Sequence, residues 1–231
     1  MKIGFGIPNN QGVKDPNDLV NLAVAVENMG CDSVWVREHL FHSSYVAKRL
    51  GDRPYHDALT VLTAVACATK SVRLGTNEIP DFSGSFYRYR GLRFSPKPYQ
   101  KPYPPILIGG SSVAARQRVA RFGDGWHTLR QTPRQFAKGR ADIFERTEIA
   151  GRDASALRFS LSIPIRFTDT PPSAPVMDRS ALTGANDDIA ETINAYKIEG
   201  LDEIVLGISS EEMNLNIKTM ERFMQDVVPH L

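Results

Sequence analysis

The residues best suited to chemistry lie in a short turn, Gly109-Gly110-Ser111-Ser112. The apolar run before it predicts a buried strand, the glycines predict a sharp turn, and the serines predict the capped start of an alanine-rich helix. Glycines admit a ligand close to the backbone, and unpaired N–H groups at a helix start attract an anion. The turn therefore predicts a phosphate site. An ordinary strand-to-helix turn stays open as the alternative, because this motif is less specific than a full Walker loop.

The charge around this turn has one sign. From Phe82 to Gly123 the sequence contains no Asp or Glu. The basic residues in that stretch are Arg88, Arg90, Arg93, Lys97, Lys101, Arg116, Arg118 and Arg121. A phosphate-bearing small molecule is the expected ligand. The net charge of the whole chain is only +2, so the basic stretch is a local feature and not a general affinity for nucleic acid or membranes.

Composition indicates one globular domain of 231 residues with 42% hydrophobic content. Cys31 and Cys67 lie at no metal or redox spacing, and both are expected to be buried free thiols, as suits a reducing cytoplasm. No metal site is predicted. The N-terminal segment is too short and too strand-like for a signal peptide, and no apolar run approaches ~18 residues. We therefore expect a soluble, cytoplasmic protein.

Strands and helices that alternate along the chain must position the turn. The predicted strands cover residues 2–7, 32–36, 72–74, 106–108, 125–128, 158–165 and 203–208. The predicted helices cover residues 16–29, 54–70, 112–122, 133–150, 186–199 and 210–228. Asp15 is expected to cap the first of these helices and Gly30 to end it. This alternation predicts an α/β fold with a parallel sheet, either a doubly wound sheet or a (β/α)8 barrel. The barrel is favoured, because no GxGxxG follows the first strand and the phosphate turn lies far along the chain.

The predicted barrel is incomplete. Seven strands follow the βα rhythm, and at about 30 residues per unit the chain is about one to two units short of eight. Residues 77–104 interrupt the rhythm with a hairpin or loop insertion.

Six segments carry a family resemblance in a fixed order. They are residues 3–8, 32–39, 72–76, 84–102, 105–112 and 123–127. Together they resemble the bacterial luciferase-like monooxygenase superfamily, and within it the oxidoreductases that depend on the deazaflavin coenzyme F420. The resemblance implies a single TIM-barrel domain over residues 1–231, with the cofactor at the carboxyl-end mouth and its phosphate in residues 109–112. It also implies hydride transfer between F420 and an organic substrate, and a homodimer.

The chain departs from this family after its third strand. Relatives place a helix, a strand and a helix, roughly 70 residues, between Thr76 and the hairpin, whereas only residues 77–81 stand there in this sequence. Either a segment is missing from the sequence, so that Thr76 and Asn77 stand farther apart than the ~3.8 Å of a peptide link, or the barrel is shortened. The first alternative is favoured, because deleting an interior strand leaves two unpaired edges.

The same resemblance points to residues that would act on the cofactor. His39 follows the second strand, where the family has a histidine that faces the cofactor ring, and it is the expected catalytic proton donor or hydrogen-bond partner. Glu38 and Thr76 are expected to help bind the cofactor, by orienting His39 and by bonding the ring. A polar loop role for His39, a solvated Glu38 and a structural Thr76 stay open. Trp126 and His127 are expected to fill the barrel wall and rim.

Other functions remain open at this point. An FMN-dependent monooxygenase would share the fold, and a shortened barrel could bind a flavin without catalysis. The basic, aromatic stretch 82–103 could also stack on single-stranded nucleic acid. Its prolines and hairpin pattern fit a loop over the barrel mouth better, so we expect no nucleic-acid partner.

Overall fold

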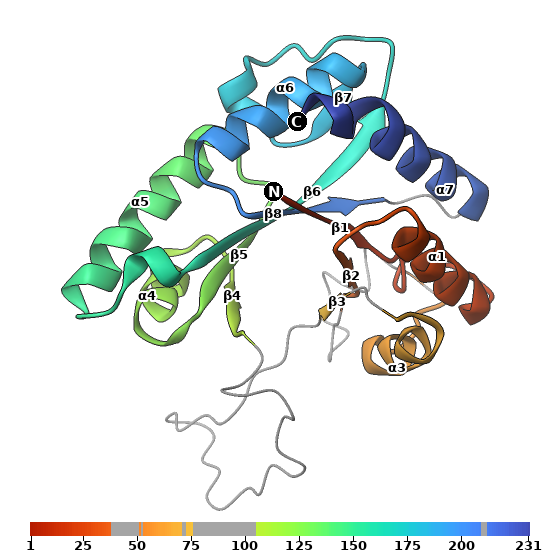
Figure 1. Ribbon diagram of the computed structural model, residues 1–231, viewed down its shortest axis with the longest axis horizontal. Helices are drawn as coiled ribbons and strands as arrows, with labels where there is room; N and C mark the ends of the chain where they lie inside the picture. Colours follow the sequence, from red (N-terminus) through yellow and green to blue (C-terminus); the bar gives the residue numbers. More distant parts are fainter. Residues whose placement is uncertain (38–50, 52, 71–72, 76–104, 209–211) are drawn as a thin grey trace, which may run out of the picture.

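Parallel strands form one curved sheet, and helices cover its outer face (Figure 1). A computed structural model describes residues 1–37, 51, 53–70, 73–75, 105–208 and 212–231. The strands are β1 (Lys2–Gly6), β2 (Ser33–Trp35), β3 (Arg73–Gly75), β4 (Leu107–Gly109), β5 (Gly125–Leu129), β6 (Arg158–Phe167), β7 (Leu182–Gly184) and β8 (Glu203–Gly207). The helices are α1 (Pro16–Asn28), α3 (Ala58–Ala68), α4 (Val113–Phe122), α5 (Pro133–Ile149), α6 (Asn186–Ile198) and α7 (Met213–Arg222).

The sheet is an open, shortened barrel. Its strand order is β3-β2-β1-β8-β6-β5-β4, and β7 pairs with the end of β6. Every strand pairing among the described residues is parallel, as βαβ units require. Among the described residues β3 and β4 each pair with one strand only, and they end the path at the point where the sequence lacks a family strand. The predicted α/β barrel class, short of a complete barrel, is confirmed, while the joint at Thr76 and Asn77 and the insertion at 77–104 lie outside the described residues.

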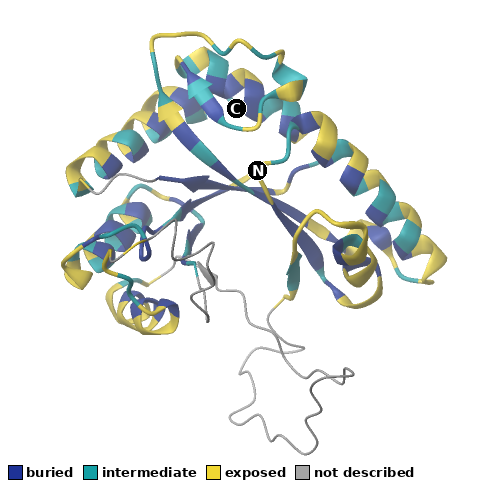
Figure 2. Ribbon diagram, turned by 180° about the vertical axis from the view of Figure 1, so that it is seen from behind, coloured by how far each residue is buried: buried dark blue, intermediate teal, exposed yellow. Residues whose placement is uncertain are grey.

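The main core lies between the sheet and its helices. Figure 2 shows the central strands mostly buried, whereas the helices carry both buried and exposed residues. Trp126 stacks on Phe136 of α5 with ring centroids 5.7 Å apart, and Gly139 leaves the space that this indole fills. Phe5 meets Phe223 edge to face at 6.2 Å. Trp126 therefore lies in the barrel wall, as predicted.

Local signals set most element ends. Asp15 caps α1 through the N–H of Asn17, and Gly30, with φ of +77°, follows its end, as the sequence predicts. Two features differ from expectation. The strand β7 is too short to show a sequence pattern, and the last predicted helix changes to a π turn at Phe223–Val227.

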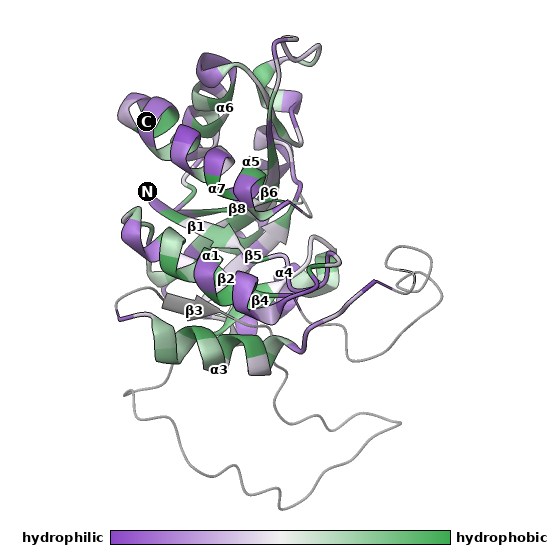
Figure 3. Cartoon of the chain, turned by 90° about the vertical axis from the view of Figure 1, so that its right-hand side faces the viewer, coloured by the Kyte–Doolittle hydropathy of each residue, from purple (hydrophilic) through white to green (hydrophobic). Residues whose placement is uncertain are grey.

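The helix α3 (Ala58–Ala68) carries no charged residue and is mostly green in Figure 3. It buries Ala58, Val61 and Val65 but leaves Leu59 48% exposed. Cys67 lies off the buried stripe and is exposed, so the prediction of a buried thiol is wrong for Cys67 and confirmed for Cys31. Burial raises the pKa of the Cys31 thiol to about 12.

Candidate functional site

The predicted phosphate turn has the geometry of an anion site. Gly110 has φ of +103°, a conformation that favours glycine. Ser112 caps α4 by accepting a hydrogen bond of 3.1 Å from the N–H of Ala115, and its own O–H can still donate. The first N–H groups of α4 have no acceptor within the helix. The structure thus brings Gly109, Gly110, Ser111 and Ser112 together on an exposed helix start, at the carboxyl end of β4.

Contacts with β5 hold this turn in place. The indole Nε1 of Trp126 donates to the carbonyl of Gly110 at 2.5 Å, and the N–H of Gly110 donates to the carbonyl of His127 at 3.2 Å. Arg116 donates to the carbonyl of Ser111 at 2.6 Å. The turn is therefore fixed relative to the sheet before any ligand arrives.

The surroundings of the turn are less positive in the folded chain than the sequence around it suggests. The Nε of Arg116 lies 2.6 Å from a carboxylate oxygen of Asp142, which comes from α5. Asp142 also accepts from Arg146 at 2.9 Å, and these two hydrogen bonds, that of Arg146 first, hold the pKa of Asp142 below its usual range. The stretch without acids in sequence thus acquires a carboxylate from another helix, and the charge of Arg116 is partly neutralised.

A second group of polar side chains lies on the inner, concave face of the sheet. Trp35 of β2 and His127 of β5 stack with ring centroids 4.9 Å apart and planes 13° apart. The strands β1, β8 and β6 separate β2 from β5 in the sheet. Two side chains can meet across three strands only inside a strongly curved sheet. This contact therefore marks the barrel interior.

Ser33 of β2 and Glu203 of β8 make a second contact on this face, over the intervening strand β1. The hydroxyl of Ser33 donates to the carboxylate of Glu203 at 2.5 Å, and Trp35 Nε1 donates to the Ser33 oxygen at 2.9 Å. These bonds pass over Gly4 on β1, where a Cβ would stand 2.2 Å from the Ser33 oxygen. A side chain at position 4 would therefore force the Ser33 hydroxyl to shift.

His127 is held on its other side by Ser160, whose Oγ lies 2.8 Å from Nδ1. The imidazole is only 7% exposed, and this burial lowers its pKa to about 4. His127 is therefore neutral at pH 7. We call Ser33, Trp35, His127, Ser160 and Glu203 the inner-face cluster; sequence reasoning identified only His127, as part of the rim.

The predicted residues Glu38, His39 and Thr76 lie outside the described residues. The segment that leads to His39 is held by Asn9, a buried residue that sequence reasoning missed. Its side-chain amide donates to the carbonyls of Arg37 at 2.8 Å and His56 at 3.0 Å, and its Oδ1 accepts from the N–H of Arg37 at 3.0 Å. The only sequence signal was the pair Asn9-Asn10, which follows β1 after Ile7 and Pro8.

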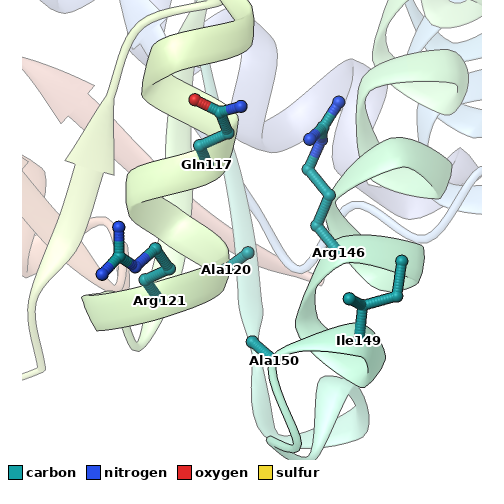
Figure 4. Close-up of a pocket in the computed structure, with 6 residues that line it drawn as sticks. All are labelled: Gln117, Ala120, Arg121, Arg146, Ile149 and Ala150. Carbon is teal, nitrogen blue, oxygen red and sulfur yellow. The ribbon is translucent and has the colours of Figure 1, made fainter.

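Two hollows are lined by residues outside the inner-face cluster. One, of about 400 Å³, separates α4 from the end of α5 and is bordered by Arg121, Arg146 and Ile149 (Figure 4). The other, of about 760 Å³, lies between the end of β6 and α7. No group of His, Cys, Asp or Glu in the described part of the chain is arranged to hold a metal ion. None of the described helices combines the length and apolar character needed to cross a membrane.

The family model described as luciferase-like monooxygenase matches residues 1–80 and 76–175. This chain belongs to the luciferase-like monooxygenase family. The match has two pieces that overlap at residues 76–80.

Two solved structures have the same fold as this chain. An F420-dependent secondary alcohol dehydrogenase in complex with an F420-acetone adduct superposes with a TM-score of 0.75 at 17% identity, over 99% of this chain and 98% of that one. A coenzyme F420 dependent tetrahydromethanopterin reductase from Methanopyrus kandleri superposes with a TM-score of 0.72 at 12% identity, over 100% and 99%. An FMNH(2)-dependent dimethylsulfone monooxygenase of Pseudomonas putida is 47% identical over 47 residues, 20% of this chain and 13% of that relative. The chain therefore matches a small part of that curated relative.

Proposed function

We propose that this chain is an oxidoreductase that transfers a hydride between coenzyme F420 and an organic substrate. One observation carries the proposal. Gly109, the first residue of the phosphate turn, is the register partner of His127, which stacks on Trp35. An anion site and an aromatic surface are therefore neighbours at one end of the sheet. A ligand that has both a phosphate and a flat ring could contact the two at once.

The described residues fit such a cofactor. Gly110 and the start of α4 supply N–H donors, Ser111 and Ser112 supply hydroxyls, and none of these positions places a bulky side chain over the turn. When bound, F420 supplies a two-electron centre that exchanges a hydride with the substrate. The protein would supply position, electrostatics and exclusion of water.

We assign the proton chemistry to His39. It would hold a proton beside the transferring centre, with Glu38 as its orienting partner and Thr76 as a further contact to the ring. In His39→Ala we expect turnover to fall at least tenfold more than affinity for F420, measured by steady-state kinetics and equilibrium binding. Equal losses in both would reduce His39 to a binding role.

An FMN-dependent monooxygenase is the second candidate. The observation that favours it is the short match to an FMNH(2)-dependent enzyme at 47% identity, higher than the identity to either F420-dependent structure above. A third candidate, a flavin-binding protein without catalysis, is favoured by the open sheet, since β3 and β4 have unpaired edges within the described residues.

Equilibrium binding of F420 against FMN, each followed by its own fluorescence, separates these candidates. We expect F420 to bind at least tenfold more tightly. Tighter FMN binding would favour the monooxygenase, and F420 binding without turnover over a panel of alcohols and imines would favour the binding protein. Failure to bind either compound would overturn all three.

We also propose that the chain forms a homodimer through α3. Its exposed side carries Leu59 and no charged residue, and apolar faces of this kind are typical of interfaces. In Leu59→Glu we expect sedimentation to shift from dimer toward monomer. Ile198 on α6 is also an exposed apolar residue, and Ile198→Glu should leave the dimer unchanged.

A further inference from the structure

We propose that Trp35 contacts the flat ring of the cofactor and that His127 is a positioning residue that holds the indole for it. This inference rests on the proposed function and names residues of the same site. Trp35 stacks on His127 and donates its Nε1 hydrogen to Ser33, so its orientation is fixed by two contacts. It is nevertheless only half-buried, so part of the indole is left for a ligand.

The strands beside Trp35 leave room for a ring. Gly6 on β1 is the register partner of both Trp35 and Gly207. A Cβ on Gly6 would meet only a backbone carbonyl, that of Leu206 at 3.7 Å. An aromatic side chain and two glycines thus stand in a row at the carboxyl ends of three adjacent strands. Such a floor fits a flat aromatic ligand, because the two glycines have no side chains and, of the atoms nearest to their Cβ positions, only the Arg37 guanidinium belongs to a side chain.

Charge borders this floor on one side. The guanidinium of Arg37 lies 3.3 Å from the Cβ position of Gly207, so it reaches over β8 at the end of the row. The carboxylate of Glu203 lies below, tied to Ser33. A ring with carbonyl or anionic edges would therefore meet a cation at its rim.

His127 is suited to a positioning role. Ser160 fixes its Nδ1 at 2.8 Å, and its plane lies within 13° of the indole. Its backbone carbonyl also accepts from Gly110, so one residue connects the aromatic surface to the phosphate turn. A shift of His127 would alter the spacing between the ring site and the phosphate site.

The test follows the emission of Trp35 while FMN or F420 is added separately at pH 7. The chain has two tryptophans, so the spectrum of Trp35→Phe supplies the Trp126 background. We expect the compound that binds more tightly to quench most of the Trp35 emission. In His127→Ala the dissociation constant of that compound should rise about tenfold. His127→Phe keeps a flat ring against the indole and should therefore recover most of the affinity. His230→Ala, at the exposed C-terminus, is the control and should bind like the wild type.

The outcomes separate the two proposals. If the wild type binds a cofactor but Trp35 is not quenched, or if His127→Ala remains folded by circular dichroism and binds within twofold of the wild type, the inference is wrong while the proposed function stands. If His127→Phe loses as much affinity as His127→Ala, stacking is not what His127 provides, and the inference is also wrong. If the wild type binds neither compound, both proposals fail.

Discussion

The phosphate turn and the inner-face cluster are neighbours in space but are encoded in different ways. The turn is made by consecutive residues, is exposed, and owes its shape to local rules for glycine and helix caps. The cluster draws one or two residues from each of four strands and is mostly buried. Local chemistry alone therefore predicts the turn, whereas the cluster exists only because the sheet curls until β2 meets β5.

The largest expected effect is a loss of folding stability at low pH, caused by His127 of the inner-face cluster. Because the pKa of His127 is about 4 in the folded chain and near 6.5 when unfolded, the unfolded state binds more protons between these values. Stability should therefore fall as the pH falls, by about 3 kcal/mol from pH 7 to pH 4. The measurement is urea unfolding of the wild type against His127→Phe, which lacks this titration. Parallel pH dependence in the two proteins would mean that His127 is not buried as described.

A smaller loss of stability should come from Gly4→Ala. The added Cβ would stand 2.2 Å from the Ser33 oxygen and 3.1 Å from Trp35 Nε1, so the cluster must shift, at a cost of about 2 kcal/mol. Gly6→Ala is the matched control on the same strand and face, where the nearest atom is 3.7 Å away. Thermal unfolding should separate the two variants clearly. Equal stability would show that Ser33 and Trp35 move aside freely.

The sequence predicted what is local and missed what depends on the curvature of the sheet. The Gly-Gly-Ser-Ser turn and the Asp15 and Ser112 caps could be predicted because adjacent residues determine them. The contacts of Glu203 and Ser160 could not be predicted from the sequence. Each is a polar residue in a strand, and its partner comes from a strand that is distant in sequence and near only in the folded sheet. The ion pair of Asp142 with Arg116 could not be predicted for the same reason, because Asp142 approaches Arg116 from a different helix.

Gly110→Val tests the turn and should act on binding. Valine strongly disfavours φ of +103°, so the backbone must leave its conformation and misalign the first N–H groups of α4. We expect affinity for the cofactor to fall about tenfold, measured by equilibrium binding. Gly151→Val imposes comparable strain at φ of +70° in the turn after α5. Comparable loss of affinity in both variants would mean that the turn is not the phosphate site.

The smallest effect, in Ser112→Ala, separates the two roles of one side chain. The hydroxyl caps α4, and α4 has no capping box to compensate, so its loss should lower stability by about 1 kcal/mol. Thr132→Ala removes the equivalent cap from α5 and should cost about the same, although Gln135 there completes a capping box. Binding is where the two should differ. If Ser112 also donates its O–H to the phosphate, only Ser112→Ala should weaken binding of the cofactor, by a few-fold, because the N–H groups of the turn remain. Equal binding by both variants would leave Ser112 as a helix cap alone and would assign phosphate binding to the backbone of the turn.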